Sequence, residues 1–267
     1  MDNTSNPAVV ALFDTLSQSY QKYASYLFHL PLGTTVSTAD TVKNSYSLNN
    51  PNIAIQLNHA KIRYKTKSFW TSLVGRVGQR YAAMRDIYNG LAPSWVNENN
   101  HGGQLGSSII EMEFEPSEDQ LETLDTNGIN CIVFDDTYGV MVTSHKTAQT
   151  PTIISDYSFI PHVRVFNYIK ENIITQVLTP QATKLNDDTH REIARIKAES
   201  IINPLVSQNL LAEAEVKCDE ENNNDEALSR REFHISIGVK VTPFSERLIL
   251  NFINVGQTSS VSEAFAV

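Results

Sequence analysis

The chain has 267 residues, of which 41% are hydrophobic and 19% charged, a composition typical of a folded protein and too apolar for a disordered one. Its formal net charge is −9, and its longest uninterrupted run of cations is Arg230-Arg231, which argues against nucleic acid as a partner. Apolar runs are far shorter than the roughly 20 residues that a bilayer requires, and the N-terminus shows no export pattern. We therefore expect a protein kept in the cytoplasm, without direct membrane insertion.

The two cysteines predict buried thiols and not a disulfide framework. Cys131 and Cys218 lie far apart in the chain, whereas a secreted scaffold carries more cysteines, in even sets. We expect both thiols to be reduced.

The first third of the chain contains three predicted elements and a loop. Residues 7–30 place apolar side chains close to helical spacing until Pro31, which predicts one amphipathic helix. Residues 32–51 are rich in Thr, Ser and Asn without periodicity and are interpreted as a loop. Residues 53–57 alternate as a strand does, and residues 69–88 are mostly helical in pattern.

The middle of the chain is predicted to turn and then to form a strand. Residues 89–106 hold Gly and Pro among Asn and Ser, so the backbone there changes direction more than once. Ile110, Met112 and Phe114 alternate with glutamates and are predicted to form the apolar face of one strand.

A short acidic helix and a hairpin follow. Ser117 precedes the helix, which runs to about residue 125, and Gly128 stands where a left-handed C-terminal cap falls. Residues 129–134 and 140–142 are predicted to be two strands of one hairpin.

Two helices are predicted to open the second half of the chain. The first covers residues 158–178, with Pro161 in its first turn, where a missing N–H group costs nothing. The second begins near Asp187, and Pro204 inside it predicts a kink or a restart. Its predicted apolar stripe consists of Ile193, Ile196, Ile201 and Leu205.

The last part of the chain is predicted to be mostly extended. Residues 214–218 form a strand, and residues 219–226 are interpreted as a flexible acidic loop. Residues 233–241 show the strictest alternation of the whole sequence, and residues 248–255 are the expected hairpin partner. Residues 261–267 predict one more short extended segment.

The sequence holds no convincing catalytic or metal-binding pattern. Its seven histidines are scattered singly, without the spacing that brings a pair to one metal. Residues 75–78 (GRVG) are better explained by close helix packing than by phosphate binding. Glu111, Glu113 and Glu115 share a strand face, but alternate residues lie about 6.6 Å apart, too far to close on one ion. We expect no catalytic residue, no metal and no cofactor.

Several motifs, in order over residues 105–256, resemble those of phage tail sheath proteins. Residues 127–132 (NGINCI) resemble the family's "LN..GIN.I" element, and residues 162–166 (HVRVF) stand where the family has an "i.VRRl" helix start. Residues 213–220 (EAEVKCDE), followed by three asparagines, stand where the family has a "v.cd..Nt" strand and turn. Val165 replaces the second arginine of the family pair.

The resemblance implies a mixed α/β (α+β) fold with β-sheets flanked by helices. It divides the chain into an α/β sheath domain, residues 1–155, and a C-terminal sheath domain with a terminal arm, residues 156–267. The C-terminal α+β subdomain has a sheet that can accept strands from neighbours. Most family members begin with an extended arm, and none is recognised before Ala8, so we expect a fragment or a compact variant.

The resemblance also implies two surfaces. Residues 232–255 would receive a strand that residues 258–267 of a neighbour donate. The expected residues of this strand exchange are Phe233, Ile235, Val261, Glu263, Phe265 and Val267. The expected tube-facing residues are Lys184, Arg191 and Arg195.

By the same resemblance, the chain is a structural subunit that polymerises around an inner tube and drives tube penetration by contraction. Its expected partners are copies of itself, the tail tube protein, and the baseplate and tail terminator proteins, in a phage tail assembled in the host bacterial cytoplasm. Four alternatives stay open: the sheath of a contractile secretion system, the sheath of a bacteriocin particle, a non-catalytic adhesin or baseplate protein, and a hydrolase with an unrecognised site.

Overall fold

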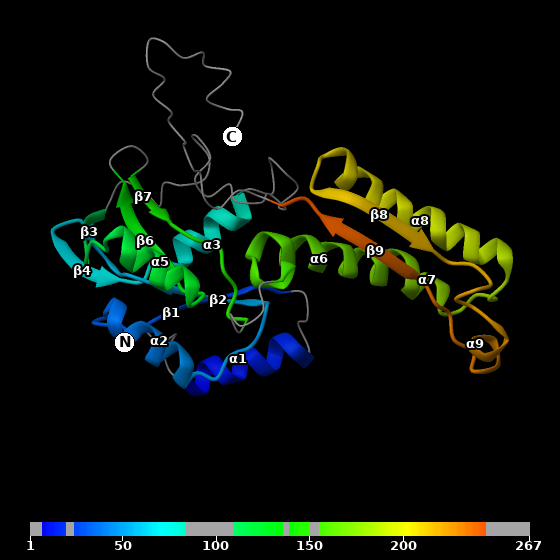
Figure 1. The fold of residues 1–267 in the computed structure, drawn as a ribbon, viewed down its shortest axis with the longest axis horizontal. Helices are drawn as coiled ribbons and strands as arrows, with labels where there is room; N and C mark the ends of the chain where they lie inside the picture. The colour runs from blue at the N-terminus through cyan, green and yellow to red at the C-terminus, as the bar shows by residue number, and fades with distance from the viewer. Residues whose placement is uncertain (1–6, 20–23, 84–108, 136–138, 150–154, 244–267) are drawn as a thin grey trace, which may run out of the picture.

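The computed structural model describes residues 7–19, 24–83, 109–135, 139–149 and 155–243. In these parts the chain forms an elongated molecule with two larger sheets at one end and a helix-backed two-stranded sheet at the other (Figure 1). The mixed α+β class predicted from the sequence is confirmed.

The central sheet has four strands in the order β1-β2-β6-β7. The first three run parallel and β7 is antiparallel to β6. All five residues of β2 are buried, because helices cover both faces of the sheet. The strands are β1 (Tyr26–His29), β2 (Ile53–Leu57), β6 (Asn130–Asp135) and β7 (Gly139–Val142).

Four helices cover this sheet. One face packs on α1 (Pro7–Ser19), α2 (Val36–Ser45) and α5 (Glu118–Thr126). The other face packs on α3 (Val74–Ala83) and on the first turn of α6 (Ile160–Asn172).

A second sheet extends the molecule beyond β2, in the order β4-β3-β5. Its strands are β3 (Ala60–Tyr64), β4 (Lys67–Thr71) and β5 (Ile109–Met112). The predicted strand near residue 110 exists, but its predicted apolar face is wrong in part: Met112 and Phe114 pack against core clusters and Ile110 does not. The register shifts opposite Lys61 and Ile62, so Ile109 and Met112 pack on the core while Ile110 is exposed.

The C-terminal part is a layer of helices under a two-stranded sheet. After a 3₁₀ turn, η3 (Asp156–Ser158), α6 continues as the π-helix η4 (Ile173–Leu178) and the short α7 (Thr179–Gln181). The chain then returns through α8, β8, α9 and β9. These are α8 (Asp188–Ser207), β8 (Leu211–Lys217), α9 (Asp225–Ser229) and β9 (Ser236–Val241).

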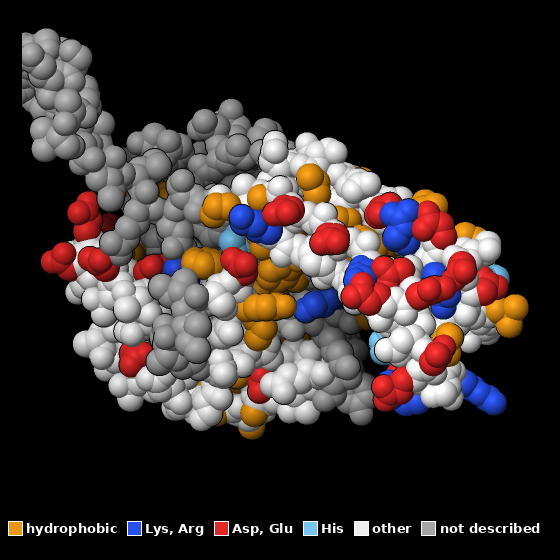
Figure 2. All heavy atoms as spheres, turned by 45° about the vertical axis from the view of Figure 1, so that its right-hand side comes forward, with side chains coloured by type: hydrophobic (Ala, Val, Ile, Leu, Met, Phe, Trp, Pro, Cys, Tyr) orange, Lys and Arg blue, Asp and Glu red, His pale blue; other side chains and the backbone are white. Residues whose placement is uncertain are grey.

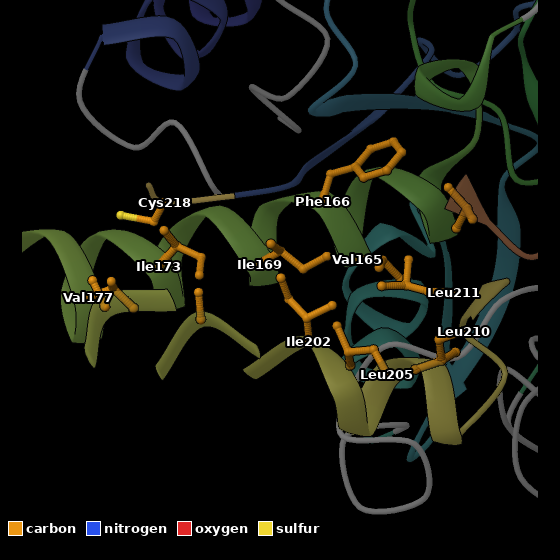
Figure 3. Packing of buried hydrophobic residues seen from close by; sticks show 13 residues of the cluster. Val165, Phe166, Ile169, Ile173, Val177, Ile202, Leu205, Leu210, Leu211 and Cys218 are labelled. Carbon is orange, nitrogen blue, oxygen red and sulfur yellow. The ribbon is translucent and has the colours of Figure 1, made fainter. Parts of the chain in front are cut away.

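The C-terminal core lies between these helices and the sheet. Figure 3 shows Ile169, Ile173 and Val177 on the α6–η4 side facing Ile202 and Leu205 of α8. The helix predicted over residues 158–178 is confirmed from Ile160 onward, and its last six residues are π-helical. The helix widens just before Pro180, whose ring cannot donate to the preceding turn and crowds the carbonyl four residues back.

Two predictions for the N-terminal region are wrong. Residues 7–30 form α1 and then β1, because residues 26–29 pair along β2, with the N–H of Tyr26 donating to Asn52 O at 2.7 Å. Residues 32–51 contain α2, which Thr35 caps together with Thr38. Local spacing could not separate a short strand of Tyr, Leu and Phe from a helix, because sheet pairing decided it.

The helix predicted over residues 69–88 begins later than expected. The first residues of that range belong to β4, and α3 starts only at Val74. Strand β3, which precedes it, was not predicted; residues 89–106, predicted to turn, lie outside the described residues.

The predicted stripe of α8 is also wrong in part. Ile193 and Ile196 are exposed, and the buried face instead carries Ala194, Ala198 and Ile202. Small alanines let the helix lie close under β8 and α6. Pro204 causes no restart: α8 is one helix from Asp188 to Ser207.

Residues 219–226, predicted to be a flexible acidic loop, form a hydrogen-bonded turn that leads into helix α9. Asn223 is buried, donates to His234 O at 2.8 Å and accepts from the N–H of His234 at 2.8 Å. Asn224 caps α9 by accepting from the N–H of Ala227 at 3.0 Å. Polar composition suggested a loop, but these asparagines bond across the turn.

Other predictions are confirmed. Ser117 caps α5, and β6 and β7 form the expected antiparallel pair. Cys131 and Cys218 are free and buried. Gly128 adopts a left-handed conformation with φ 65°.

Gly128 should not tolerate a side chain. A Cβ atom would lie 3.0 Å from Lys43 Nζ and 3.2 Å from Thr147 O, in addition to the left-handed strain. We expect Gly128→Ala to lower the free energy of unfolding by about 1–3 kcal/mol in urea titrations. Gly238→Ala is the control, since a Cβ atom there meets nothing within 4 Å, and an equal loss in both variants would contradict this account.

Two histidines meet where the central sheet joins the second sheet. The rings of His29 and His59 lie 4.0 Å apart, and His59 Nδ1 is 3.1 Å from Glu113 Oε2. The two nitrogens of His29 face the carbonyl oxygens of Leu30 and Asn58, at 2.9 and 3.1 Å. Burial and the neighbouring His59 lower the pKa of His29 from 6.5 to about 4.

This depressed pKa predicts acid sensitivity. The unfolded chain takes up a proton below pH 6.5 that the folded chain refuses until about pH 4, so stability is lost as the pH falls through this window. We expect His29 alone to lower the free energy of unfolding by about 2 kcal/mol between pH 7 and pH 5. Urea unfolding of the wild type and of His29→Gln at both pH values measures it. An equally steep pH dependence in the variant would exclude His29 as its source.

Candidate assembly surface

Strand β9 is paired along one edge within the described residues. It forms an antiparallel ladder with β8, from Lys217 opposite Ser236 to Leu211 opposite Val241. Along its other edge, no strand of the described residues pairs with it. The expected hairpin partner, residues 248–255, lies outside the described residues.

The two faces of β9 differ as the alternation predicted. Ile237, Val239 and Val241 turn toward the helices and pack against the C-terminal core. Ser236, Gly238 and Lys240 are exposed on the opposite face. One face therefore anchors the strand and the other is presented to the outside.

An apolar groove of about 610 Å³ lies between β9 and the α6–η4 helix. Its walls are mostly apolar, with an aromatic corner in which the rings of Tyr157 and Phe166 lie 4.9 Å apart. The lining residues are Ser155, Asp156, Tyr157, Phe166, Ile169, Lys170, Ile173, Ile174, Leu178, Ile235, Ile237 and Val239.

The helical wall of this groove was not predicted as a functional surface. The sequence does carry a sign of this wall, because the helix has more apolar residues than its buried stripe needs. Ile173 and Val177 belong to the buried stripe, and Ile174 and Leu178 lie beside it. Because η4 is π-helical, its turns are wider than those of an α-helix, and the pair at Ile173–Ile174 serves both the core and the groove.

The structure places only part of the predicted strand-exchange set. Phe233 and Ile235 lie just before β9, partly buried against the C-terminal core, and Ile235 lines the groove. Val261, Glu263, Phe265 and Val267 lie outside the described residues.

The three predicted tube-facing residues occupy different environments. Lys184 is exposed in the connection before α8. Arg191 is only 6% exposed; its guanidinium donates to Asn186 Oδ1 at 3.2 Å and forms an ion pair with Asp188. Its position makes Arg191 an internal anchor of the α8 N-terminus.

Arg195 lies between two carboxylates on α8. Its Nε donates to Glu192 Oε2 at 2.8 Å, and its Nη1 pairs with Glu199. The hydrogen bond from Arg195 lowers the pKa of Glu192. The charge of Arg195 is therefore compensated by its neighbours, and the exposed surface of the helix also carries two isoleucines, Ile193 and Ile196.

The described residues contain no group of three or more His, Cys, Asp or Glu side chains that could hold a metal ion. Within the same residues, no helix combines the length and apolar content needed to cross a bilayer.

Comparison with known proteins connects this geometry to contractile sheaths. Residues 154–253 match the family model of the phage tail sheath C-terminal domain. A search of curated proteins finds no match. The resemblance seen in the sequence is therefore confirmed for this C-terminal region.

Solved structures extend the likeness to most of the chain. A chain of the anti-feeding prophage (AFP) baseplate is 17% identical with a TM-score of 0.70, over 93% of this chain and 65% of that one. A chain of an extracellular contractile injection system, the contracted PVC sheath, is 17% identical with a TM-score of 0.72, over 89% and 64%. A sheath tail protein from Listeria innocua is 12% identical with a TM-score of 0.53, over 89% and 53%.

At these identities the likeness concerns the fold, which is that of contractile sheath proteins. The chain spans about two thirds of the length of the first two of these chains.

The buried arginine of α8 should matter for stability and its exposed neighbour should not. We expect Arg191→Ala to lower the free energy of unfolding by about 1–3 kcal/mol, because it removes a buried side chain together with its hydrogen bond to Asn186 and its ion pair with Asp188. Arg195→Ala, the control, removes only half-exposed ion pairs, for which about 0.5 kcal/mol is typical. Urea unfolding compares the two; a larger loss in the Arg195 variant would refute the assignment of Arg191 as the anchor.

Proposed function

We propose that this chain is a structural subunit of a contractile sheath, which polymerises around an inner tube and drives the tube forward by contraction. One observation carries the proposal: β9 offers an edge that no described strand occupies, beside a 610 Å³ apolar groove. A strand added at such an edge gains main-chain hydrogen bonds, and its alternate side chains fill the groove.

The donated strand in this proposal is residues 258–267 of a neighbouring copy. Val261, Phe265 and Val267 are spaced by even numbers, so an extended segment places them on one face, toward the groove. Glu263 falls on the same face of an extended segment. Lys170 at the groove wall is the cation that we propose as the ion-pair partner of its carboxylate. Phe233 and Ile235 belong to the receiving side.

Strand addition suits a sheath because it links copies without fixing their angle. Main-chain hydrogen bonds hold the register, while the segment that leads to the donated strand bends as subunits move. Contraction then needs no nucleotide, since the contracted array is the arrangement of lower free energy. The chain acts as a structural protein in this mechanism and not as an enzyme.

The proposed tube contact lies on α8 and the connection before it. Lys184 and Arg195 are accessible for it, and Arg191 holds the helix start in place behind them. The exposed Ile193 and Ile196 belong to the same outward face and would supply apolar contact.

We propose copies of the chain, the tail tube protein, the baseplate and the tail terminator as partners, in a phage tail assembled in the bacterial cytoplasm. The sheath of an extracellular injection particle is the second candidate. It is favoured by the likeness to an AFP baseplate chain and to the contracted PVC sheath.

Assembly should depend on the groove. Negative-stain microscopy of concentrated protein, alone and with the cognate tube protein, is expected to show tubes or ring stacks. We expect Ile235→Asp and a chain lacking residues 258–267 to remain single particles, because one loses the receiving groove and the other the donated strand.

Ser236→Asp is the matched control, since it adds the same charge one residue further on, outside the groove lining. It should assemble as the wild type does. Single particles from the wild type, with its tube protein present, would contradict the sheath proposal; normal tubes from Ile235→Asp would contradict the role of the groove.

A further inference from the structure

The tip of the β3–β4 hairpin is a basic spot on an acidic chain. Residues 61–67 hold four cations and no carboxylate, although the formal net charge is −9. Lys61 pairs with Glu111 at 3.0 Å, but no described carboxylate forms an ion pair with Arg63, Lys65 or Lys67. The cations alternate with other residues along the strand, so they form no run in the sequence.

This tip also exposes aromatic surface. Tyr64 is 65% exposed and Phe69 is 47% exposed. Lys65, at the turn with φ 55°, places its Nζ 5.5 Å from the centre of the Tyr64 ring. By the strand register, Tyr64, Lys67 and Phe69 share one face of the hairpin and Arg63 lies on the other. Aromatic side chains are enriched in protein–protein contacts.

The opposite end of the molecule has the complementary character. Residues 219–226 hold five carboxylates and no cation. Asn186 donates to Asn223 Oδ1 at 3.3 Å and to Glu232 O at 2.9 Å, which ties the start of α8 to this acidic turn. Leu185, 73% exposed, and Leu228, 38% exposed, provide apolar surface on the same end.

The two ends cannot meet within one chain. In Figure 1 the β3–β4 hairpin and α9 lie at opposite ends of the longest axis of the molecule. Figure 2, with the C-terminal part turned forward, shows acidic side chains over this part of the molecule, with Lys and Arg side chains between them. Complementary surfaces at opposite ends of one molecule generate a head-to-tail contact between copies, which closes into a ring or continues as a helix.

We propose that the β3–β4 tip of one copy docks on the acidic end of the next copy, formed by residues 219–226 and Leu185. The proposal deepens the sheath function and rests on it, because it names a second contact between copies besides strand exchange. The chosen partner follows from charge. Arg63, Lys65 and Lys67 have no ion pair with a described carboxylate, and at the acidic end Asp219, Glu220 and Asp225 have none with a described cation, whereas Glu221 and Glu226 pair with Lys217 and Arg230. Apolar side chains accompany the charges on both surfaces.

Charge swapping tests the contact directly. The hairpin variant is R63E/K65E/K67E, and the acidic-end variant is E220K/E221K/D225K. Asp219 is left intact because its carboxylate accepts the N–H groups of Glu221 and Asn222, at 2.9 and 3.3 Å. Both sets lie at exposed positions, and circular dichroism checks that both variants fold.

Sedimentation velocity of the full chain at low salt is the measurement. We expect each variant alone to associate at least about tenfold more weakly than the wild type, because like charges then face each other. We expect an equal mixture of the two variants to regain association, since each brings the charge that the other lacks. About 0.5 M salt should abolish the difference by screening. Lys197→Glu, an exposed cation of α8 outside both surfaces, should associate as the wild type does.

The outcomes separate this contact from the sheath function. Failure of the mixture to associate, while the wild type forms tubes, would overturn the hairpin contact and leave the sheath proposal standing. Rescue by the mixture, without tubes from the wild type, would support the contact and not the sheath. Binding of a DNA or RNA oligonucleotide by the wild-type tip, lost in the hairpin variant and without charge-swap rescue, would also overturn the proposal.

Discussion

The packing of β9 on the α6–η4 helix is the interaction on which the C-terminal part depends. A sheet of two strands is marginal by itself and needs an apolar surface beneath it. That surface comes from Ile169, Ile173 and Val177 on one side and from α8 on the other (Figure 3). The same apolar wall continues past the strand into the groove, where we propose that a further strand binds.

The two contacts that we propose between copies differ in physical character. Strand addition at β9 uses main-chain hydrogen bonds and apolar side chains, which salt hardly affects. Docking of the β3–β4 tip on the acidic end uses accessible charges, which steer association and weaken as salt rises. Strand addition would keep neighbouring copies connected, and the charge contact would allow them to shift. The combination suits an array whose copies change their relative position without separating.

The N-terminal part contributes rigidity more than chemistry. Its central sheet is covered on both faces, and buried polar groups hold its junctions. Asn58, with φ 82°, donates to Phe114 O at 2.9 Å and Ile132 O at 2.7 Å, which fixes the connection between the two sheets. Next to it lies the buried His29, whose pKa is lowered to about 4, so this junction is one acid-sensitive point of the described fold.

The sequence by itself determined those elements whose signals are local. The Ser117 cap, the Gly128 turn and the alternation along β9 depend on neighbouring residues only, and each was predicted correctly. The motifs after residue 105 were enough to indicate the sheath family.

Tertiary structure alone decided β1, whose four residues are extended because β2 pairs with them, and the buried face of α8, where close packing selects alanines over isoleucines. It also decided the candidate surfaces: Arg191 turned out to be buried by contacts with Asn186 and Asp188, and the groove exists only where η4 and β9 meet in space. Such features depend on residues far apart in the chain, which local periodicity cannot bring together.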